Sequence, residues 1–165
     1  MAVTSVLAQH AALRLRFQRT ESGWSQTLVD IETEIPFHVE NLCHLSAEDQ
    51  DGALQERASY WQRSLDLENG PLTRVILIQM SSGQRLLWCI HHLVVDGVSW
   101  RILLANLESA CAQAQAGMAV VLPPPPASFS TWARYLAGLS TDPKLSDESI
   151  YWQGWDPIPP LPKDW

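Results

Sequence analysis

Near the start of the chain the residue pattern predicts a β-hairpin. Apolar and charged positions alternate there with the two-residue period of a strand that has one apolar face: Leu13, Arg14, Leu15, Arg16 and Phe17. A turn is predicted over residues 19–23, and residues 24–29 return as the second strand. Residues 3–12, which precede the hairpin, fit the end of a helix. A short extended piece is expected over residues 36–39.

The pattern then changes to a helical period and back to strands. Ser46, with Asp49 three residues later, resembles a capping box, and it is followed by apolar residues at helical spacing: Leu54, Ala58, Trp61 and Leu65. We therefore predict a helix over residues 47–65. Apolar runs over residues 75–80 and 85–91, joined by a Ser-Ser-Gly turn, predict paired strands typical of a central sheet buried on both faces.

The clearest helix follows Asp96 and Gly97. Its apolar positions fall on one face: Trp100, Leu103, Leu104, Leu107, Ala110, Cys111 and Ala114. A proline-rich linker is predicted over residues 117–127, because the prolines at 123–126 exclude a helix there. Two short helices are expected after it, over residues 128–139 and 147–155.

Composition limits the class of protein. A chain of 165 residues that is 46% hydrophobic can bury the core of one domain. The formal net charge of −7, with 11 Lys and Arg that form no run, argues against a nucleic-acid partner. The three cysteines are an odd number at wide spacing, which suggests neither a disulfide framework nor a zinc site. We expect no metal.

The sequence also indicates the cellular compartment of the protein. No window approaches the ~18 apolar residues of a membrane span, and no charged segment followed by an apolar stretch marks a secretory leader. Free cysteines fit a reducing environment. The sequence therefore predicts a cytoplasmic protein with no membrane partner.

Two adjacent histidines are the strongest candidates for chemistry. His91 and His92 lie where a predicted strand ends and a loop begins, which is where catalytic groups tend to lie. Neighbouring side chains of a strand point to opposite faces, so at most one of the two should act as a base. From the spacing alone, each histidine could equally be a non-catalytic residue, either buried in the core or exposed on the surface. Asp96, just before a helix, is equally explained as an ordinary N-cap.

Longer segments resemble a known family. HHLVVDGVSW at residues 91–100 resembles the HHxxxDG motif of the condensation superfamily in nonribosomal peptide synthetases, and the continuation Val98-Ser99-Trp100-Arg101 resembles its epimerization-domain branch. Three further segments agree in order with family elements and extend the match over essentially the whole chain: HAALRLRF at 10–17, GPLTR at 70–74 and SFSTWA at 128–133.

This resemblance implies a fold. It implies a chloramphenicol-acetyltransferase-like sandwich of class α/β, with a mixed sheet covered by helices. Residues 1–165 would be the single N-terminal lobe of a condensation or epimerization-type domain, truncated at both ends. In the family two lobes form a V, and the 4'-phosphopantetheine arms of carrier proteins enter the tunnel between them. The expected partners are a peptidyl carrier protein and the C-terminal lobe, and no cofactor of the chain's own is expected.

The resemblance also implies residue roles. His92 would be catalytic, and His91 would be structural. Asp96 would orient the loop while paired with an arginine of the early element, for which Arg14 is the candidate. Gly97 would permit a tight turn.

Other residues keep two interpretations. Ser99 and Trp100 are candidates for lining a substrate channel, although Ser99 is equally explained by helix capping. Three tryptophans are expected to be core anchors: Trp61, Trp88 and Trp100. His10 and His44 are predicted to lie on the surface.

The reaction implied is epimerization of a carrier-bound L-aminoacyl or L-peptidyl thioester to its D form. A neutral imidazole suits removal of a proton alpha to a carbonyl. In the family a glutamate of the second lobe works opposite the histidine, and no segment here matches that motif. We therefore predict that the isolated chain is inactive.

Three alternatives stay open. The chain could belong to a peptide-bond-forming condensation domain, with His92 positioning or deprotonating the acceptor amine. It could be a single-lobe acyltransferase completed by oligomerisation. It could also be a non-catalytic fragment that docks a carrier protein.

Overall fold

A computed structural model describes residues 1–31, 35–124 and 128–153. The chain divides into two compact units, Met1–Pro125 and Pro126–Trp165. The first unit holds the sheets and helices α1 to α3, and the second holds helices α4 (Phe129–Leu139) and α5 (Pro143–Gln153). The histidine-containing segment thus lies in the first unit.

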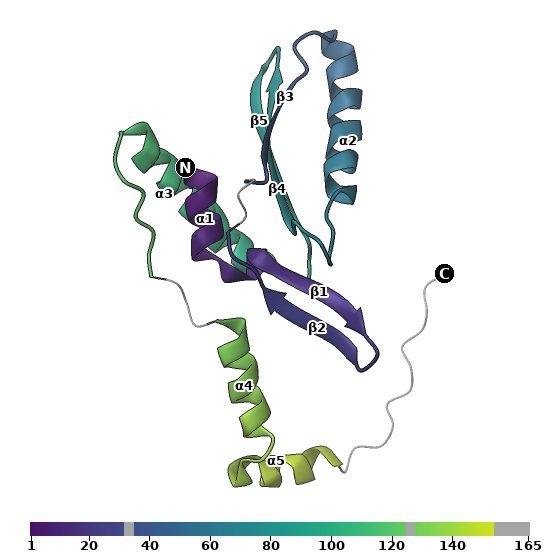
Figure 1. The fold of residues 1–165 in the computed structure, drawn as a ribbon, viewed down its shortest axis with the longest axis vertical. Helices are drawn as coiled ribbons and strands as arrows, with labels where there is room; N and C mark the ends of the chain where they lie inside the picture. The colour runs from purple at the N-terminus through teal and green to yellow at the C-terminus, as the bar shows by residue number, and fades with distance from the viewer. Residues whose placement is uncertain (32–34, 125–127, 154–165) are drawn as a thin grey trace. The chain divides into compact units, whose positions relative to one another are not determined.

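The centre of the first unit is a mixed three-stranded sheet in the order β3-β4-β5 (Figure 1). Strand β3 (Phe37–Asn41) pairs in parallel with β4 (Thr73–Met80), and β5 (Gly83–Ile90) pairs antiparallel with β4. Helix α2 (Ala47–Arg63) forms the crossover between the two parallel strands. The predicted α/β class with a mixed sheet is confirmed.

A separate β-hairpin joins β1 (Leu15–Thr20) to β2 (Gly23–Leu28). It follows helix α1 (Ala2–Gln9) and a 3₁₀ turn over Ala11–Arg14. The predicted helix over residues 3–12 is therefore too long, because the last residues before the strand tighten into 3₁₀ geometry, as helix ends often do.

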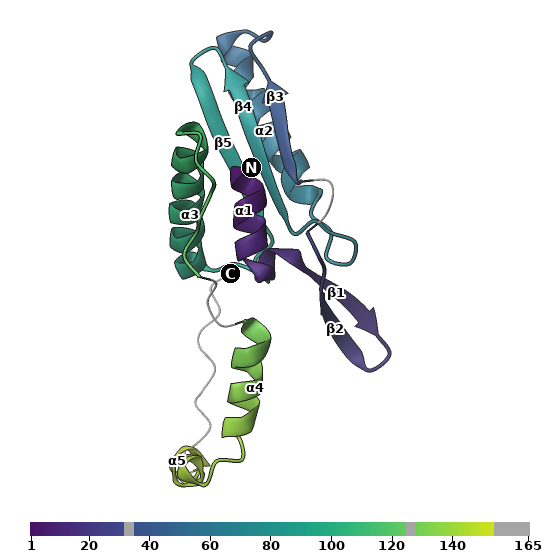
Figure 2. The same ribbon diagram turned by 60° about the vertical axis from the view of Figure 1, so that its left-hand side comes forward.

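Two apolar cores lie on opposite faces of the sheet. One forms between the sheet and α2: Leu42, Trp61, Ile76, Ile78, Met80 and Cys89. The other joins α1 to helix α3 (Gly97–Gln115), which lie side by side in Figure 2. Trp88 and Ile90 of β5 pack against this second core. Because strand side chains alternate between faces, the strand leading to His91 contacts both cores.

Several predicted elements differ from the structure in detail. β4 is largely buried, but β5 is not: Leu86 is 49% exposed, so only the end of β5 near His91 is covered. On α3, Leu104 is 51% exposed and Cys111 is exposed, which narrows the buried face. The turn formed by Ser46 and Asp49 is confirmed as the start of α2.

The second unit also follows the sequence pattern in part. Ser128 caps α4 by accepting a hydrogen bond from the backbone N–H of Thr131, as the predicted start requires. Helix α5 begins at Pro143, earlier than predicted, because proline is favoured in the first turn of a helix. The predicted end of this helix at 154–155 and the linker residues 125–127 lie outside the described residues.

Candidate active site

The candidate site is the loop between β5 and α3, residues 91–96, here called the histidine loop. The backbone N–H of His91 donates to Leu72 O at 2.9 Å, which continues the strand ladder past the end of β5. The Val94 N–H donates to His91 O at 3.0 Å and closes a turn. Val95 is only 6% exposed and belongs to the α1–α3 core. The loop is thus held at both ends by backbone bonds and by burial.

The two histidines have different environments. The ring of His91 is partly buried, and its Nδ1 accepts a hydrogen bond from the Leu93 N–H at 3.2 Å. This bond fixes the orientation of the His91 ring relative to the loop backbone. His92 is exposed. Among the described residues nothing hydrogen-bonds to its side chain. The two neighbours therefore differ in exposure, but both lie beyond the end of β5 at Ile90, so strand alternation is not the cause.

Asp96 is the N-cap of α3. Its Oδ1 accepts from the backbone N of Ser99 at 2.7 Å and from Ser99 Oγ at 2.6 Å. Both bonds lower the pKa of Asp96 below its ordinary value, and the bond from the Ser99 hydroxyl contributes more than the bond from its backbone N–H. The N-cap interpretation of Asp96 and the capping interpretation of Ser99 are both confirmed.

The predicted pair between Arg14 and Asp96 is not formed. Arg14 Nε donates to Leu7 O at 3.1 Å, and Nη1 donates to Val29 O at 2.6 Å. Leu7 lies in the last turn of α1, where helix carbonyls lack partners within the helix. The guanidinium therefore satisfies carbonyls where α1 and the hairpin meet, and it does not reach the histidine loop.

Gly97 does not make the turn that the resemblance implied. It is the first residue of α3, and it is absent from the described glycines with positive φ, which are Gly23, Gly70, Gly83 and Gly117. A Cβ added at Gly97 would meet no atom within 4 Å. The turn before α3 therefore does not require a glycine at this position.

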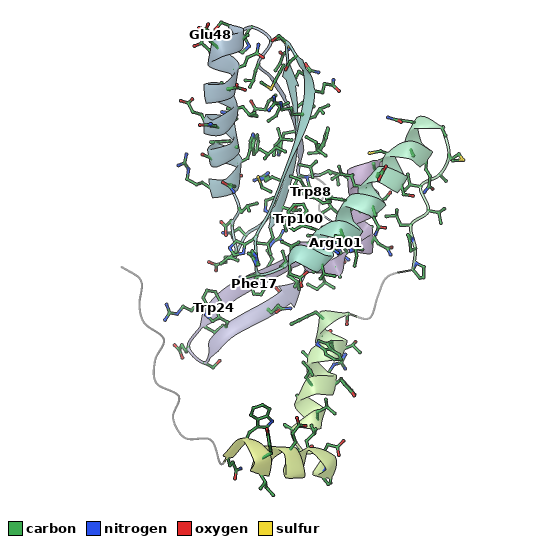
Figure 3. The ribbon with its side chains drawn as sticks, turned by 180° about the vertical axis from the view of Figure 1, so that it is seen from behind. Phe17, Trp24, Glu48, Trp88, Trp100 and Arg101 are labelled. Atoms are coloured by element: carbon green, nitrogen blue, oxygen red, sulfur yellow. The ribbon has the colours of Figure 1, made fainter. Side chains whose placement is uncertain are left out.

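Trp88 and Trp100 pack against each other between β5 and α3. Their ring centroids are 5.5 Å apart at an interplanar angle of 85°, an edge-to-face contact. Figure 3 shows both side chains where the sheet faces α3. The core-anchor interpretation is confirmed for these two residues and for Trp61, which is 9% exposed. A channel-lining role for Trp100 stays a prediction.

His10 is partly buried, whereas the sequence predicted a surface position. Its Nε2 lies 2.8 Å from Nδ2 of Asn106, a buried residue of α3, and burial lowers the pKa of His10. His44 is exposed, as predicted. Asn106 was missed by sequence reasoning. Asn106 could have been recognised as a polar residue within the apolar pattern of the predicted helix, between Leu103 and Leu107, both of which are buried.

A second polar cluster, on the α2 face of the sheet, was also missed. The Glu40 carboxylate accepts hydrogen bonds from Arg57 and from Trp61 Nε1, the latter at 2.9 Å. Burial alone would raise the pKa of Glu40, but these bonds outweigh it and lower the pKa. His38, which the sequence did not place, stacks on Trp61 with centroids 4.3 Å apart. The cluster fixes α2 to β3 and lies on the opposite face from Trp88.

A pocket lies between α1, the hairpin and the start of β4, and it is lined mainly by apolar side chains together with Arg14, Arg16 and Asp30. His92 is exposed, and no residue of the histidine loop lines this pocket. Among the described residues no three His, Cys, Asp or Glu side chains gather in an arrangement that could hold a metal ion. No described helix is long and apolar enough to cross a bilayer.

Comparison with known proteins decides the family. The family model described as "Condensation domain" matches residues 1–163. The chain belongs to the condensation-domain family. Its sequence is 42% identical to part of the linear gramicidin synthase of Brevibacillus parabrevis over 166 residues, and 39% identical to a chondramide synthase of Chondromyces crocatus over 165 residues. These matches cover 98% and 96% of the chain but 2% and 4% of the two relatives.

Solved structures of this family share the fold. The epimerization domain from the third module of tyrocidine synthetase B matches with a TM-score of 0.87 and 34% identity, covering 99% of this chain and 38% of that one. The starter condensation domain of rhizomide synthetase matches with a TM-score of 0.73 and 19% identity, over 94% of this chain and 38% of that one, which shows the fold alone. The chain has the α/β fold of a single condensation-type lobe.

Proposed function

We propose that this chain supplies the histidine-bearing lobe of an epimerization domain, which converts a carrier-bound L-aminoacyl or L-peptidyl thioester to its D form. The observation that carries the proposal is the exposure of His92 on a loop whose other parts are anchored. An imidazole that is accessible and has no competing hydrogen bond can accept a proton from a substrate near neutral pH.

The proton balance is simple. The Cα–H bond of the thioester breaks, the proton forms a bond to a ring nitrogen of His92, and the electron pair passes to the thioester carbonyl as an enolate. A proton then returns to the opposite face of Cα from a second acid. That acid is proposed to lie on the second lobe, as the family resemblance implies. The substrate is proposed to arrive on the phosphopantetheine arm of a peptidyl carrier protein.

Two further observations favour epimerization over other reactions of the family. Residues 98–101 continue the histidine motif in the form typical of the epimerization branch. The tyrocidine epimerization domain also matches with a higher TM-score and identity than the starter condensation domain.

Peptide-bond condensation is the second candidate. A structure described as showing condensation domain-mediated chain release from the enacyloxin polyketide synthase is 27% identical, with a TM-score of 0.68. In that case His92 would position or deprotonate the acceptor amine.

The test uses a polypeptide in which this chain is followed by its second lobe. It is incubated with a carrier protein loaded with an L-aminoacyl thioester, and the released amino acid is analysed for chirality. We expect the D form from the parent polypeptide, none above background from His92→Ala, and parental amounts from His44→Ala. D product that does not depend on His92 would refute the assignment. A dipeptidyl product without D amino acid would favour condensation, and unchanged carrier binding with no reaction at all would favour a docking role.

A further inference from the structure

The two stems of the histidine loop contact each other through aromatic rings. Trp88 lies on β5 just before the loop, and Trp100 lies in the first turn of α3 just after it. Their edge-to-face contact at 5.5 Å closes the base of the loop (Figure 3). Such pairs add about 0.5–1.5 kcal/mol beyond the burial of their area. The distance between β5 and α3 is therefore set where the loop leaves one and enters the other.

The contact is fixed from the central strand. The indole Nε1–H of Trp88 donates to Thr73 Oγ1 at 2.8 Å, and Thr73 on β4 is 1% exposed. Both tryptophans also pack against the α1–α3 core. A continuous series of contacts thus runs from β4 through Trp88 to Trp100, so the start of α3 is held relative to the sheet.

His92 has no such support of its own. Within the described part of the chain its side chain makes no hydrogen bond. The loop around it is held by backbone hydrogen bonds and by the burial of Val95. The position of its ring therefore follows from the positions of the two stems. Misplacement of a catalytic group by about 1 Å can reduce a rate by about 10²-fold.

We propose that Trp88 and Trp100 are positioning residues, which place the His92 imidazole by fixing the separation of β5 from α3. The expected effect on catalysis rests on the proposed function. The expected effect on structure, a histidine loop ordered by the tryptophan pair, does not rest on that function, and the two effects are measured separately.

The structural measurement uses this chain itself and follows exchange of the Leu93 amide proton, which the His91 ring binds. Trp100→Ala should speed this exchange by about tenfold, the equivalent of one hydrogen bond. Trp100→Phe should leave it near the parental rate, because a phenyl ring can keep the edge-to-face contact. Leu107→Ala, which truncates a buried residue about two turns further along the same helix, is the control for general destabilisation. Trp24→Ala, at a tryptophan that is 67% exposed on the hairpin, is the control for loss of an indole.

The catalytic measurement uses the polypeptide with both lobes, well below its melting temperature. Trp100→Ala should lower kcat about 10²-fold with little change in the KM for loaded carrier protein. Trp100→Phe should restore most of the rate, and Leu107→Ala should keep it. Equal losses of kcat in Trp100→Ala and Leu107→Ala, or unchanged Leu93 exchange in Trp100→Ala, would overturn the proposal. If the parent polypeptide produces no D amino acid while Leu93 exchange changes as expected, the proposed function fails and the positioning of the loop stands.

Discussion

The Asp96 carboxylate accepts two hydrogen bonds from one residue, Ser99, with Oδ1 at 2.7 Å from the backbone N and 2.6 Å from Oγ. Both bonds lie at the first turn of α3, so the carboxylate is used to begin the helix that follows the histidine loop. Asp96 thus begins α3 directly after the loop, and His92 within the loop is exposed.

Removal of the Ser99 hydroxyl tests this arrangement. Ser99→Ala deletes the side-chain bond that contributes most to the lowered pKa of Asp96, so the pKa should rise toward its ordinary value. A carboxyl group whose pKa is lower in the folded than in the unfolded chain stabilises the fold at any pH above its ordinary pKa of 3.8. This stabilisation is lost as the pH falls through the folded-state pKa. The Ser99→Ala variant should therefore lose part of the stabilisation that the lowered pKa provides. The pKa of Asp96 is measured by carboxyl carbon NMR over pH 2–6, with Ser82→Ala, at an exposed serine, as the control. An unchanged Asp96 titration would contradict the account.

Gly97→Ala should be tolerated by the fold. A Cβ there meets open space, and φ is not positive. Alanine is the better helix former, so the free energy of unfolding should stay the same or rise by up to about 1 kcal/mol. Urea denaturation measures this. The matched control is Gly70→Ala, where φ is +77° and a Cβ would meet the Arg16 guanidinium, and it should be clearly destabilising. A large loss at Gly97 would show a backbone constraint that this structure lacks.

The partial burial of His10 should make the free energy of unfolding depend on pH. Burial lowers the pKa of His10 below its model-peptide value of 6.5, so the unfolded chain binds more protons between the two pKa values. The stabilisation is complete above 6.5 and decreases as the pH falls toward the folded-state pKa. Chemical denaturation at pH 5.5 and 7.5 should show a smaller pH difference for His10→Gln than for the parent. His44→Gln should behave like the parent, and equal pH differences in all three would refute the burial argument.

The α2 core should be sensitive to single truncations. Ile78 on β4 is 0% exposed, and Ile78→Ala should lower the free energy of unfolding by about 2–5 kcal/mol. Val39 on the neighbouring strand β3 is 56% exposed on the other face, and Val39→Ala should cost less than about 1 kcal/mol. Urea denaturation of the two variants compares the faces directly, and similar costs would contradict the assignment of the core.

Sequence reasoning succeeded where a feature depends on local chemistry. The Ser46 and Asp96 caps, the helical spacing around Trp61 and the apolar run of β4 are set within a few residues, so their patterns predict the elements correctly.

The failures concern choices among distant partners. Arg14 can donate to any carbonyl or carboxylate within reach, and only the meeting of α1 with the hairpin places Leu7 O and Val29 O there. His10 was assigned to the surface from the general exposure of polar residues, and the sequence does not show that α3 brings Asn106 against it. The exposure of Leu86 has the same cause, since an apolar strand does not reveal how far α1 and α3 extend over it.

The central claim, that His92 removes the α-proton of a carrier-bound thioester, is tested most directly by solvent exchange. The polypeptide with both lobes is incubated in D₂O with a carrier loaded with L-aminoacyl thioester, and deuterium at Cα is followed by mass spectrometry. The account predicts one deuterium per turnover in the parent and a rate lower by about 10²–10⁴-fold in His92→Ala. Exchange at the parental rate in His92→Ala, or peptide-bond formation without deuterium at Cα, would contradict it.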